Sequence, residues 1–296
     1  MTIHEAYRQL RNQLENIYEG REAIRIAELV IESISGFTRI ERIISKDKTL
    51  TDIQQNILED YTTALLNHTP VQYVLHEVWF AGMKFFVDEN VLIPRPETEE
   101  LVEWIAETVN SEWSMVNGES LDGIKKISLI DIGTGSGCIP IALKKKFAEA
   151  DVYGIDVSER ALNVARRNAL YNNADVHFEN MNILDKSAWQ ALPSFDIIVS
   201  NPPYITQSEA NEMQNNVLMH EPHIALFVPD NDPLLFYKNI AEFALLYLRQ
   251  NGLLFFEINE AFGKELMQML TVKGFIKTEI KKDLQGKERM ISGRRR

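Results

Sequence analysis

The sequence of 296 residues contains a single cysteine, Cys138. One cysteine cannot form an intrachain disulfide, a zinc knuckle or an iron–sulfur cluster, so the fold must depend on its core. No apolar run approaches the roughly 20 residues that a membrane-spanning helix needs. The opening residues MTIHEAYRQLRNQ also lack the apolar stretch of a signal peptide. These absences lead us to expect a soluble protein of the cytoplasm with no membrane partner.

Positive charge is also scarce, because 31 Lys and Arg residues stand against 43 Asp and Glu residues, a net charge of −12. Contacts with phosphates supply most of the non-specific affinity of proteins for DNA and RNA, and they need positive charge. The balance therefore argues against a direct nucleic-acid target, although a local basic patch could override it. The hydrophobic fraction of 45% is typical of a globular chain with a sizeable core.

Residues 1–69 contain no proline, and their only glycines are Gly20 and Gly36. Apolar residues recur there at the three- and four-residue spacing of amphipathic helices. The clearest run consists of Ala23, Ile26, Ala27, Val30, Ile31 and Ile34. We therefore predict a small helical domain over 1–69.

The texture changes at residue 70, where valine and aromatic residues become frequent. The run VQYVLHEVWFAGMKFFVDENVLIP (71–94), with Ala81-Gly82 as a turn, predicts a β-hairpin. We assign residues 70–93 to this hairpin, as the connector between two domains. Residues 94–296 then alternate strands and helices. We predict strands at 126–132, 151–157, 176–180, 195–201 and 252–258, a helix that ends at Asn251-Gly252, and two terminal β segments. Such alternation predicts an α/β fold with a doubly wound parallel sheet, which binds ligands at the carboxyl ends of its strands.

A glycine loop with Gly133, Gly135 and Gly137 follows the first of these strands, two residues after Asp131. Glycine lets the backbone turn sharply and approach a ligand closely. Asp156 ends the next strand, 19 residues beyond Gly137. In a doubly wound sheet its carboxylate faces the same crevice, where it can accept hydrogen bonds from both ribose hydroxyls. Loop, strand and acid together predict a nucleotide-binding site.

The loop reads GxGxG, whereas the dinucleotide fingerprint GxGxxG would place its third glycine at Cys138. Asp131 would repel a pyrophosphate and would favour a cationic ligand, such as a methionine-derived sulfonium. The pattern therefore favours S-adenosyl-L-methionine over NAD. The alternative is that these glycines only permit tight packing of a strand against a helix.

The segment Asn201-Pro202-Pro203-Tyr204 follows the strand at 195–201 directly. Two prolines end the strand and leave Asn201 at the carboxyl edge of the sheet. The Asn201 side-chain oxygen and the Pro202 carbonyl can each accept one hydrogen of a planar NH2 group, and Tyr204 can stack on its face. Aligning that nitrogen with an incoming methyl group needs no strong general base. The alternative is a proline turn that simply ends a strand.

The loop at 131–137, Asp156 and the NPPY at 201–204 resemble those of class I methyltransferases that modify planar nitrogens. NPPY alone is ambiguous, because adenine-N6 DNA methyltransferases share it. LIPRPETEELVEW (92–104) and EPHIALF (221–227) narrow the resemblance to the HemK/PrmC family, the release factor glutamine methyltransferases. The resemblance spans essentially the whole chain. It implies a Rossmann-like, mostly parallel sheet of seven strands, a small all-α N-terminal domain that recognises the substrate, and the hairpin connector at 70–93.

The resemblance also implies roles for individual residues. The loop around the methionine part of S-adenosyl-L-methionine comprises Gly133, Thr134, Gly135, Ser136 and Gly137. Asp131, Asp156 and Asn201 are further expected cofactor contacts, with Asp156 at the ribose. Relatives often carry an acid and an aromatic residue near the adenine, where this chain has Asn182 and Ile183. Asn182 can still accept a hydrogen bond through its oxygen, and Asp185 is an alternative.

For the substrate, the resemblance implies that Asn201, Pro202, Pro203 and Tyr204 hold the side-chain amide of a glutamine. This glutamine belongs to the GGQ motif of peptide chain release factors and becomes N5-methylglutamine. Asn201, Pro202 and Tyr204 are the expected catalytic residues. The protein is expected to act as a monomer.

Two rival functions remain open at this stage. One is a nucleic-acid amino methyltransferase, which would need a basic groove and usually flips a base out of its stack. The other is a protein that binds S-adenosylmethionine without chemistry, which would have no need of an NPPY. We expect no metal, because His220 and His223 lack a third strong ligand nearby. We interpret Cys138 as a small packing residue.

Overall fold

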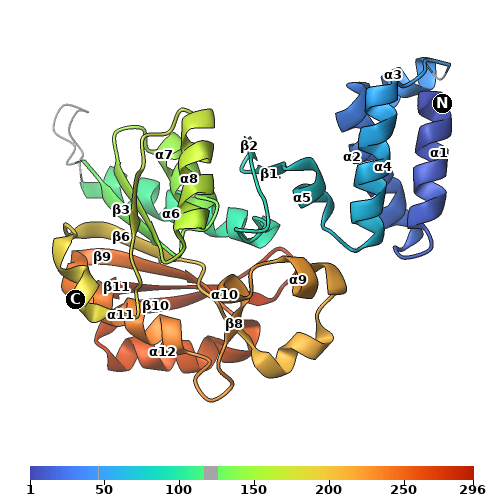
Figure 1. The fold of residues 1–296 in the computed structure, drawn as a ribbon. Helices are drawn as coiled ribbons and strands as arrows, with labels where there is room; N and C mark the ends of the chain where they lie inside the picture. Colours follow the sequence, from blue (N-terminus) through green and yellow to red (C-terminus); the bar gives the residue numbers. More distant parts are fainter. Residues whose placement is uncertain (46, 117–125) are drawn as a thin grey trace. The chain divides into compact units, whose positions relative to one another are not determined.

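The computed structural model describes residues 1–45, 47–116 and 126–296. The chain forms two compact units, each described here by itself (Figure 1). The helical unit comprises Met1–Glu77 and Met213–His220, and the sheet unit comprises Val78–Glu212 and Glu221–Arg296. None of the helices in the described parts of the chain is long and apolar enough to cross a membrane.

The helical unit packs its amphipathic helices around one apolar core. The longer helices present apolar stripes at helical spacing, and these stripes bury residues such as Leu10, Ile31 and Leu65. Capping boxes begin three of the helices, because a threonine hydroxyl accepts a hydrogen bond from the third backbone N–H. The predicted helical N-terminal region is thus confirmed. Its helices are α1 (Ile3–Leu14), α2 (Gly20–Ser35), α3 (Arg39–Ile44), α4 (Asp52–Leu66), α5 (Val71–Leu75) and α9 (Asn215–His220).

The sheet unit begins with a short antiparallel hairpin of β1 (Val78–Phe80) and β2 (Met83–Phe85). Ala81 and Gly82 both have positive φ angles, 49° and 74°, as a two-residue hairpin turn requires. The predicted turn is therefore right, but the prediction of β structure from residue 71 is wrong. Val71–Leu75 forms helix α5, because Val74 is buried in the core of the helical unit and this burial outweighs β propensity.

A seven-stranded sheet has the order β10-β11-β9-β6-β3-β4-β5, and β11 runs antiparallel to both its neighbours. The remaining pairs are parallel. This arrangement confirms the predicted class I methyltransferase fold. The strands are β3 (Ser128–Ile132), β4 (Asp151–Asp156), β5 (His177–Asn180), β6 (Phe195–Ser200), β9 (Leu248–Glu257), β10 (Phe275–Lys282) and β11 (Glu288–Arg295).

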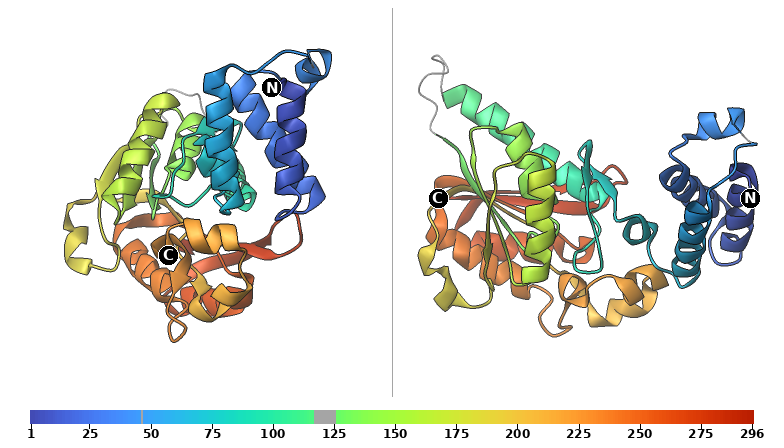
Figure 2. Two further views of the ribbon diagram at one scale, coloured as in Figure 1. Left: turned by 45° about the vertical axis from the view of Figure 1, so that its right-hand side comes forward. Right: turned by 45° about the horizontal axis from the view of Figure 1, so that its top comes forward.

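Helices cover both faces of this sheet, as two views show (Figures 1 and 2). Alternate residues of each buried strand point to opposite faces, so Leu129 packs with one helical layer and Ile130 with the other. The first layer consists of α6 (Pro96–Val116), α7 (Cys138–Lys146) and α8 (Glu159–Tyr171), and the second of α11 (Leu235–Tyr247) and α12 (Gly263–Val272). The short elements are η2 (Lys186–Ala191), β7 (Ile205–Thr206), η3 (Gln207–Glu212), α10 (His223–Leu226), β8 (Phe227–Val228) and η4 (Glu260–Phe262).

One predicted boundary is wrong. Helix α11 ends at Tyr247, and Asn251-Gly252 lies inside strand β9 instead of closing the helix. The pairing of β9 with β6 shifts register across this stretch, and Asn251 has a φ of 62°. An Asn-Gly pair that accepts positive φ thus forms an irregularity within a strand as well as at a helix end.

Strand order decides where the ligand crevice lies. From β3 the chain proceeds outward through β4 and β5, and then returns to β6 on the other side of β3. In such a sheet the crevice opens at the carboxyl ends of the strands where the order reverses. Ile132, Asp156 and Ser200 end β3, β4 and β6, so the segments that follow them meet at this edge.

Candidate functional site

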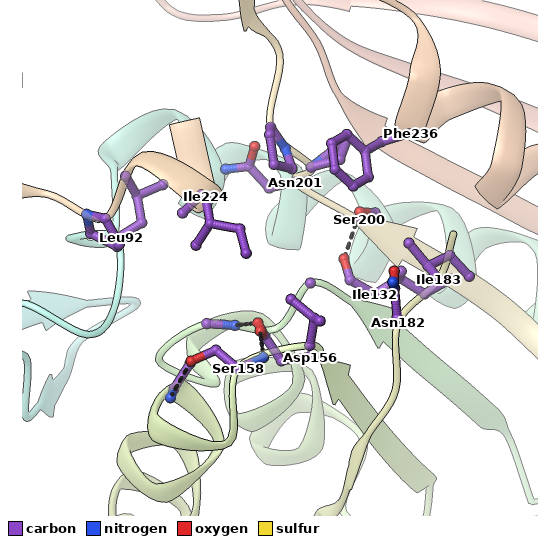
Figure 3. Close-up of a pocket in the computed structure, with 18 of the residues that line it drawn as sticks. Leu92, Ile132, Asp156, Ser158, Asn182, Ile183, Ser200, Asn201, Ile224 and Phe236 are labelled. Atoms are coloured by element: carbon purple, nitrogen blue, oxygen red, sulfur yellow. Dashed lines mark hydrogen bonds between the residues drawn. The ribbon is translucent and has the colours of Figure 1, made fainter. Parts of the chain in front are cut away.

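A cavity of about 260 Å3 opens at this edge of the sheet (Figure 3). Gly133, Gly135 and Asp156 line it from the glycine loop and β4, and Asn201 and Pro202 line it from the segment after β6. The two motifs that the sequence pattern singled out therefore share one cavity wall. Pro203, Asn182 and Ile183 also line the cavity, whereas Asp131, Thr134, Ser136, Gly137 and Tyr204 do not.

The glycine loop takes a conformation that side chains rarely adopt. Gly133, Gly135 and Gly137 have φ angles of 76°, 52° and 78°. The backbone N–H of Gly133 donates to the carbonyl oxygen of Ile155 at 2.8 Å, which ties the loop to β4. A Cβ atom on Gly137 would lie 3.1 Å from that of Ala165, so this glycine lets α7 start close against α8.

Asp156 secures the loop from the end of β4. Its Oδ2 accepts a hydrogen bond from the Gly135 N–H at 2.9 Å, and its Oδ1 accepts one from the Ser158 N–H at 2.9 Å (Figure 3). Burial raises the pKa of Asp156, and the backbone donors oppose this rise. Each oxygen keeps a further acceptor position toward the cavity that it lines.

Asp131 is the least satisfied polar group near the loop. Its side chain is 0% exposed, and neither of its oxygens has a hydrogen-bond partner among the residues that the structure describes. The hydroxyl oxygen of Thr134 is buried and lacks a partner in the same sense. Burial raises the pKa of Asp131 to about 7, the neighbouring Thr134 hydroxyl opposes this rise, and the charge of Asp156 adds to it. Such orphaned oxygens fit a ligand group that would supply hydrogen bonds and positive charge.

Asn182 and Ile183 lie on the wall of the cavity that follows β5 (Figure 3). The Asn182 oxygen accepts a hydrogen bond from the Leu184 N–H at 3.0 Å, so only one of its lone pairs stays open to a ligand. The alternative, Asp185, accepts hydrogen bonds from Ser187 and does not line the cavity. Phe236 of α11 also lines the cavity and supplies an aromatic ring that the sequence analysis missed.

The NPPY segment is fixed by hydrogen bonds at both of its ends. Ser200, directly before it, donates through Oγ to the Ile132 carbonyl at 2.6 Å. The Tyr204 hydroxyl donates to Glu257 Oε1 at 3.2 Å, and burial raises the pKa of this phenol well above its ordinary value. The Tyr204 ring packs against the apolar cluster between the sheet and helices α11 and α12. The predicted stacking of Tyr204 on a substrate therefore stays a prediction.

Two further polar residues that sequence reasoning missed contact this segment. Asn201 donates through Nδ2 to Thr98 Oγ1 at 3.2 Å, and Thr98 donates to Glu257 Oε2 at 2.6 Å. Thr98 and Glu257 are only 3% and 1% exposed. The sequence signal for Glu257 was a single acid near the end of the apolar strand GLLFFEI. The signal for Thr98 was its place inside LIPRPETE.

An ion pair joins the two segments that narrowed the family resemblance. Arg95 Nη2 lies 2.6 Å from Glu221 Oε1, and Glu221 Oε2 accepts a hydrogen bond from the Ile93 N–H at 3.3 Å. Leu92 and Ile224, one from each segment, line the cavity. Burial raises the pKa of Glu221, and Arg95 opposes this. The pair therefore holds two pieces of one wall together.

The other candidates have ordinary surroundings. Cys138 is buried in the apolar cluster, and burial raises the pKa of its thiol to about 12, so it serves as a packing residue. The His220 ring lies 2.9 Å from the Asn67 carbonyl oxygen. No cluster of three or more His, Cys, Asp or Glu side chains within residues 1–45, 47–116 and 126–296 could hold a metal ion.

Comparison with known proteins assigns both parts of the chain. Residues 5–75 match the family model of the PrmC N-terminal domain, and residues 118–226 match that of the methyltransferase small domain. The release factor glutamine methyltransferase of Flavobacterium psychrophilum is 42% identical, with 98% of each chain covered. That of Bacteroides thetaiotaomicron is 39% identical over 97% of this chain and 98% of its own length.

Solved structures add a likeness of fold. The hMettl16 catalytic domain in complex with the MAT2A 3'UTR hairpin 6 superposes with a TM-score of 0.52 at 16% identity, with 82% of this chain and 81% of that chain covered. The T. thermophilus 16S rRNA N2 G1207 methyltransferase in complex with AdoMet and guanosine gives a TM-score of 0.50 at 18% identity, with 74% and 50% covered. At such identity these likenesses concern the fold alone.

Proposed function

The chain belongs to the family of release factor glutamine methyltransferases, and on this premise we propose that it methylates a glutamine of peptide chain release factors. The methyl group passes from S-adenosyl-L-methionine to the side-chain amide nitrogen, N5, of the glutamine in the GGQ motif. The enzyme is thus a protein-glutamine N5-methyltransferase.

One observation supports this proposal most directly. Asn201 and Pro202 line the same cavity as Gly133, Gly135 and Asp156. A group that aligns a planar NH2 therefore faces a site suited to a nucleoside. A protein that merely bound the nucleoside would have no need for Asn201 and Pro202 to align an NH2 group.

The residues present fit S-adenosylmethionine. Asp156 offers open acceptor positions for the ribose hydroxyls. The orphaned oxygens of Asp131 and Thr134 suit the ammonium group of its methionine part. Ile183 and Phe236 provide an apolar surface for the adenine. S-Adenosylmethionine supplies a methyl group made electrophilic by the positive sulfur that carries it.

The chain's own contribution is alignment of the substrate nitrogen. The Asn201 oxygen and the Pro202 carbonyl each accept one hydrogen of the glutamine NH2, which turns the nitrogen lone pair toward the methyl group. Glu257, a carboxylate close to Asn201, already accepts hydrogen bonds from two hydroxyl groups. We therefore assign no strong general base to the reaction, and the proton that the nitrogen loses on methylation passes to water.

The partner is a protein, and this accords with the acidic chain of net charge −12. We propose that the helical region at 1–69 and the hairpin help to bind the release factor, that the connector at 70–93 joins this region to the methyltransferase domain at 94–296, and that the enzyme acts as a monomer. Since release factors act on ribosomes, the proposed location is the cytoplasm.

A labelling experiment tests the proposal. The purified chain is incubated with radiolabelled S-adenosylmethionine and a release factor, its GGQ Gln→Ala variant, DNA or RNA. Label should enter the unmodified factor alone, and Asn201→Ala should abolish transfer while leaving cofactor binding largely intact. Label in nucleic acid but in neither protein would overturn the substrate and keep the methyltransferase chemistry.

A further inference from the structure

We propose that Glu257 is a positioning residue that acts through Thr98 to set which end of the Asn201 amide faces the cavity. The proposal rests on the proposed function, because it concerns how Asn201 comes to accept a hydrogen from the glutamine NH2. An asparagine amide has an accepting oxygen and a donating NH2 at nearly equivalent positions. Only the oxygen can hold the hydrogens of a second NH2 group, so the orientation of this amide decides whether the site works.

The sheet brings Glu257 to Asn201 from the far end of the sequence. Strands β6 and β9 are parallel, and their register pairs Ser200 with Phe256. The next residues along the chain are Asn201, just after β6, and Glu257, the last residue of β9, so both lie at the same edge of the sheet. Thr98, the third residue of α6, fills the space between them.

The hydroxyl groups leave only one consistent arrangement. An ionised carboxylate accepts hydrogen bonds and cannot donate them. Thr98 is 2.6 Å from Glu257 Oε2 and must direct its only hydrogen there. Its oxygen can then only accept from Asn201, and only the Asn201 Nδ2 can donate. The Asn201 oxygen is thereby turned away from Thr98.

Both oxygens of Glu257 accept a hydroxyl hydrogen, as a carboxylate does, although burial works against its charge. Burial raises the pKa of this carboxyl, while the hydroxyl donors Thr98 and Tyr204 and the positive charge of Arg289 lower it. The Tyr204 hydroxyl binds the second oxygen, Oε1. Glu257 therefore contacts one end of the NPPY segment directly and the other end through Thr98, without itself lining the cavity.

Substitutions at Thr98 separate orientation from simple packing. Thr98→Val keeps the shape and removes the hydroxyl, so the Asn201 amide loses the acceptor that orients it. We expect kcat for release factor methylation to fall about 10- to 100-fold, the usual effect of losing a group that orients a functional side chain. Binding of S-adenosylmethionine in calorimetry should stay unchanged. Thr98→Ser restores the hydroxyl and should recover most of the lost kcat.

Thr108→Val is the matched control. Thr108 lies on the same helix, and its hydroxyl donates to the Trp104 carbonyl at 2.8 Å. This variant should leave kcat unchanged. A Thr98→Val enzyme with the kcat of the unmodified chain would overturn the proposal, and so would a Thr98→Ser enzyme as slow as Thr98→Val.

A second background tests the orientation itself. In Asn201→Asp both side-chain oxygens accept hydrogen bonds, so no choice of end remains. Thr98→Val should therefore slow Asn201→Asp much less than it slows the unmodified chain, and an equal factor in both would contradict the role of Thr98. Glu257→Gln introduces an NH2 group that can donate to Thr98, so the Thr98 hydroxyl hydrogen is no longer held by residue 257. This single substitution, with Asn201 in place, should slow methyl transfer.

Failure of the proposed function gives a different result. If the unmodified chain labels no release factor, the substrate assignment is wrong whatever the Thr98 variants do. If it labels the GGQ glutamine and Thr98→Val does so equally fast, the function holds and the role of Glu257 and Thr98 is wrong.

Discussion

Asp131 and Asp156 lie beside the same glycine loop but differ in their partners. Asp156 accepts two backbone hydrogen bonds, whereas Asp131 has no partner among the described residues. A buried polar group without a partner lowers stability, so such groups persist mostly where a ligand satisfies them. Each of the two carboxylates therefore has a separate measurable consequence.

For Asp131 we predict a pH-dependent gain in stability on substitution. Burial raises its pKa from 3.8 to about 7, so the folded chain binds a proton that the unfolded chain has lost between these values. The contribution of Asp131 thus becomes unfavourable as the pH rises through this range and is fully unfavourable above pH 7. Asp131→Asn should raise the free energy of unfolding, measured with urea at pH 8 without ligand, by about 1–3 kcal/mol. The gain should shrink at pH 5, and an equal gain at both pH values would contradict the assignment.

The same variant should bind S-adenosylmethionine more weakly, because an amide cannot attract an ammonium group as a carboxylate does. We expect a Kd at least about tenfold higher by calorimetry at pH 8. An unchanged Kd would remove Asp131 from the cofactor site.

For Asp156 we predict a loss of cofactor affinity. Asp156→Ala removes the acceptor for the ribose and also frees the Gly135 and Ser158 N–H groups, so binding should weaken by about 1.5–3 kcal/mol. Asp185→Ala is the control, since Asp185 is also an acid that follows a strand of the sheet but does not line the cavity. Equal losses for the two variants in calorimetry would show that Asp156 has no special role.

At the scale of elements, the wall formed by 92–96 and 221–226 depends on one ion pair. Glu221→Ala would leave Arg95 and the Ile93 N–H without this carboxylate. Because a third of the Arg95 side chain is exposed, we expect a loss of about 1–3 kcal/mol rather than the full cost of breaking a buried pair. Urea unfolding measures it. Glu260→Ala, which breaks an exposed pair with Lys287, should change stability by less than about 1 kcal/mol.

Strands β3, β4 and β6 of the sheet could be predicted to within about two residues, because buried parallel strands are short apolar runs between turns. The strands predicted at 126–132 and 195–201 are observed at Ser128–Ile132 and Phe195–Ser200. Errors arose where tertiary contacts outweighed local preference. Val71–Leu75 is valine-rich yet helical, and Asn251-Gly252 lies within a strand.

The site could be predicted only in part for a related reason. Asp156 and Asn201 belong to motifs whose strand context can be read locally. Glu257 ends an apolar strand and Thr98 lies within LIPRPETE, but nothing in either segment shows that they meet Asn201, which happens because β9 lies beside β6 in the sheet. Strand order across a sheet is a property of the whole fold and leaves no mark on either segment alone.

At the scale of the whole molecule, recognition of a protein substrate needs exposed contact groups. Trp79 in the hairpin is 60% exposed, and the Lys84 ammonium lies 5.3 Å from its ring centre. Exposed tryptophans often dominate protein interfaces, so Trp79→Ala should raise the KM for release factor about five- to thirtyfold at unchanged cofactor Kd. Leu170→Ala, at a residue 82% exposed on α8, should leave the KM unchanged. A normal KM for Trp79→Ala would exclude the hairpin from the interface.

The segment Met213–His220 belongs to the helical unit, although the residues on both sides of it belong to the sheet unit. The chain therefore passes between the units three times, after Glu77, Glu212 and His220. In evolutionary terms, a single recombination after Glu77 could not exchange the whole helical unit. A graft of residues 1–77 alone would lack α9. An enzyme from which residues 1–77 were removed would keep α9 without the helices that it belongs with.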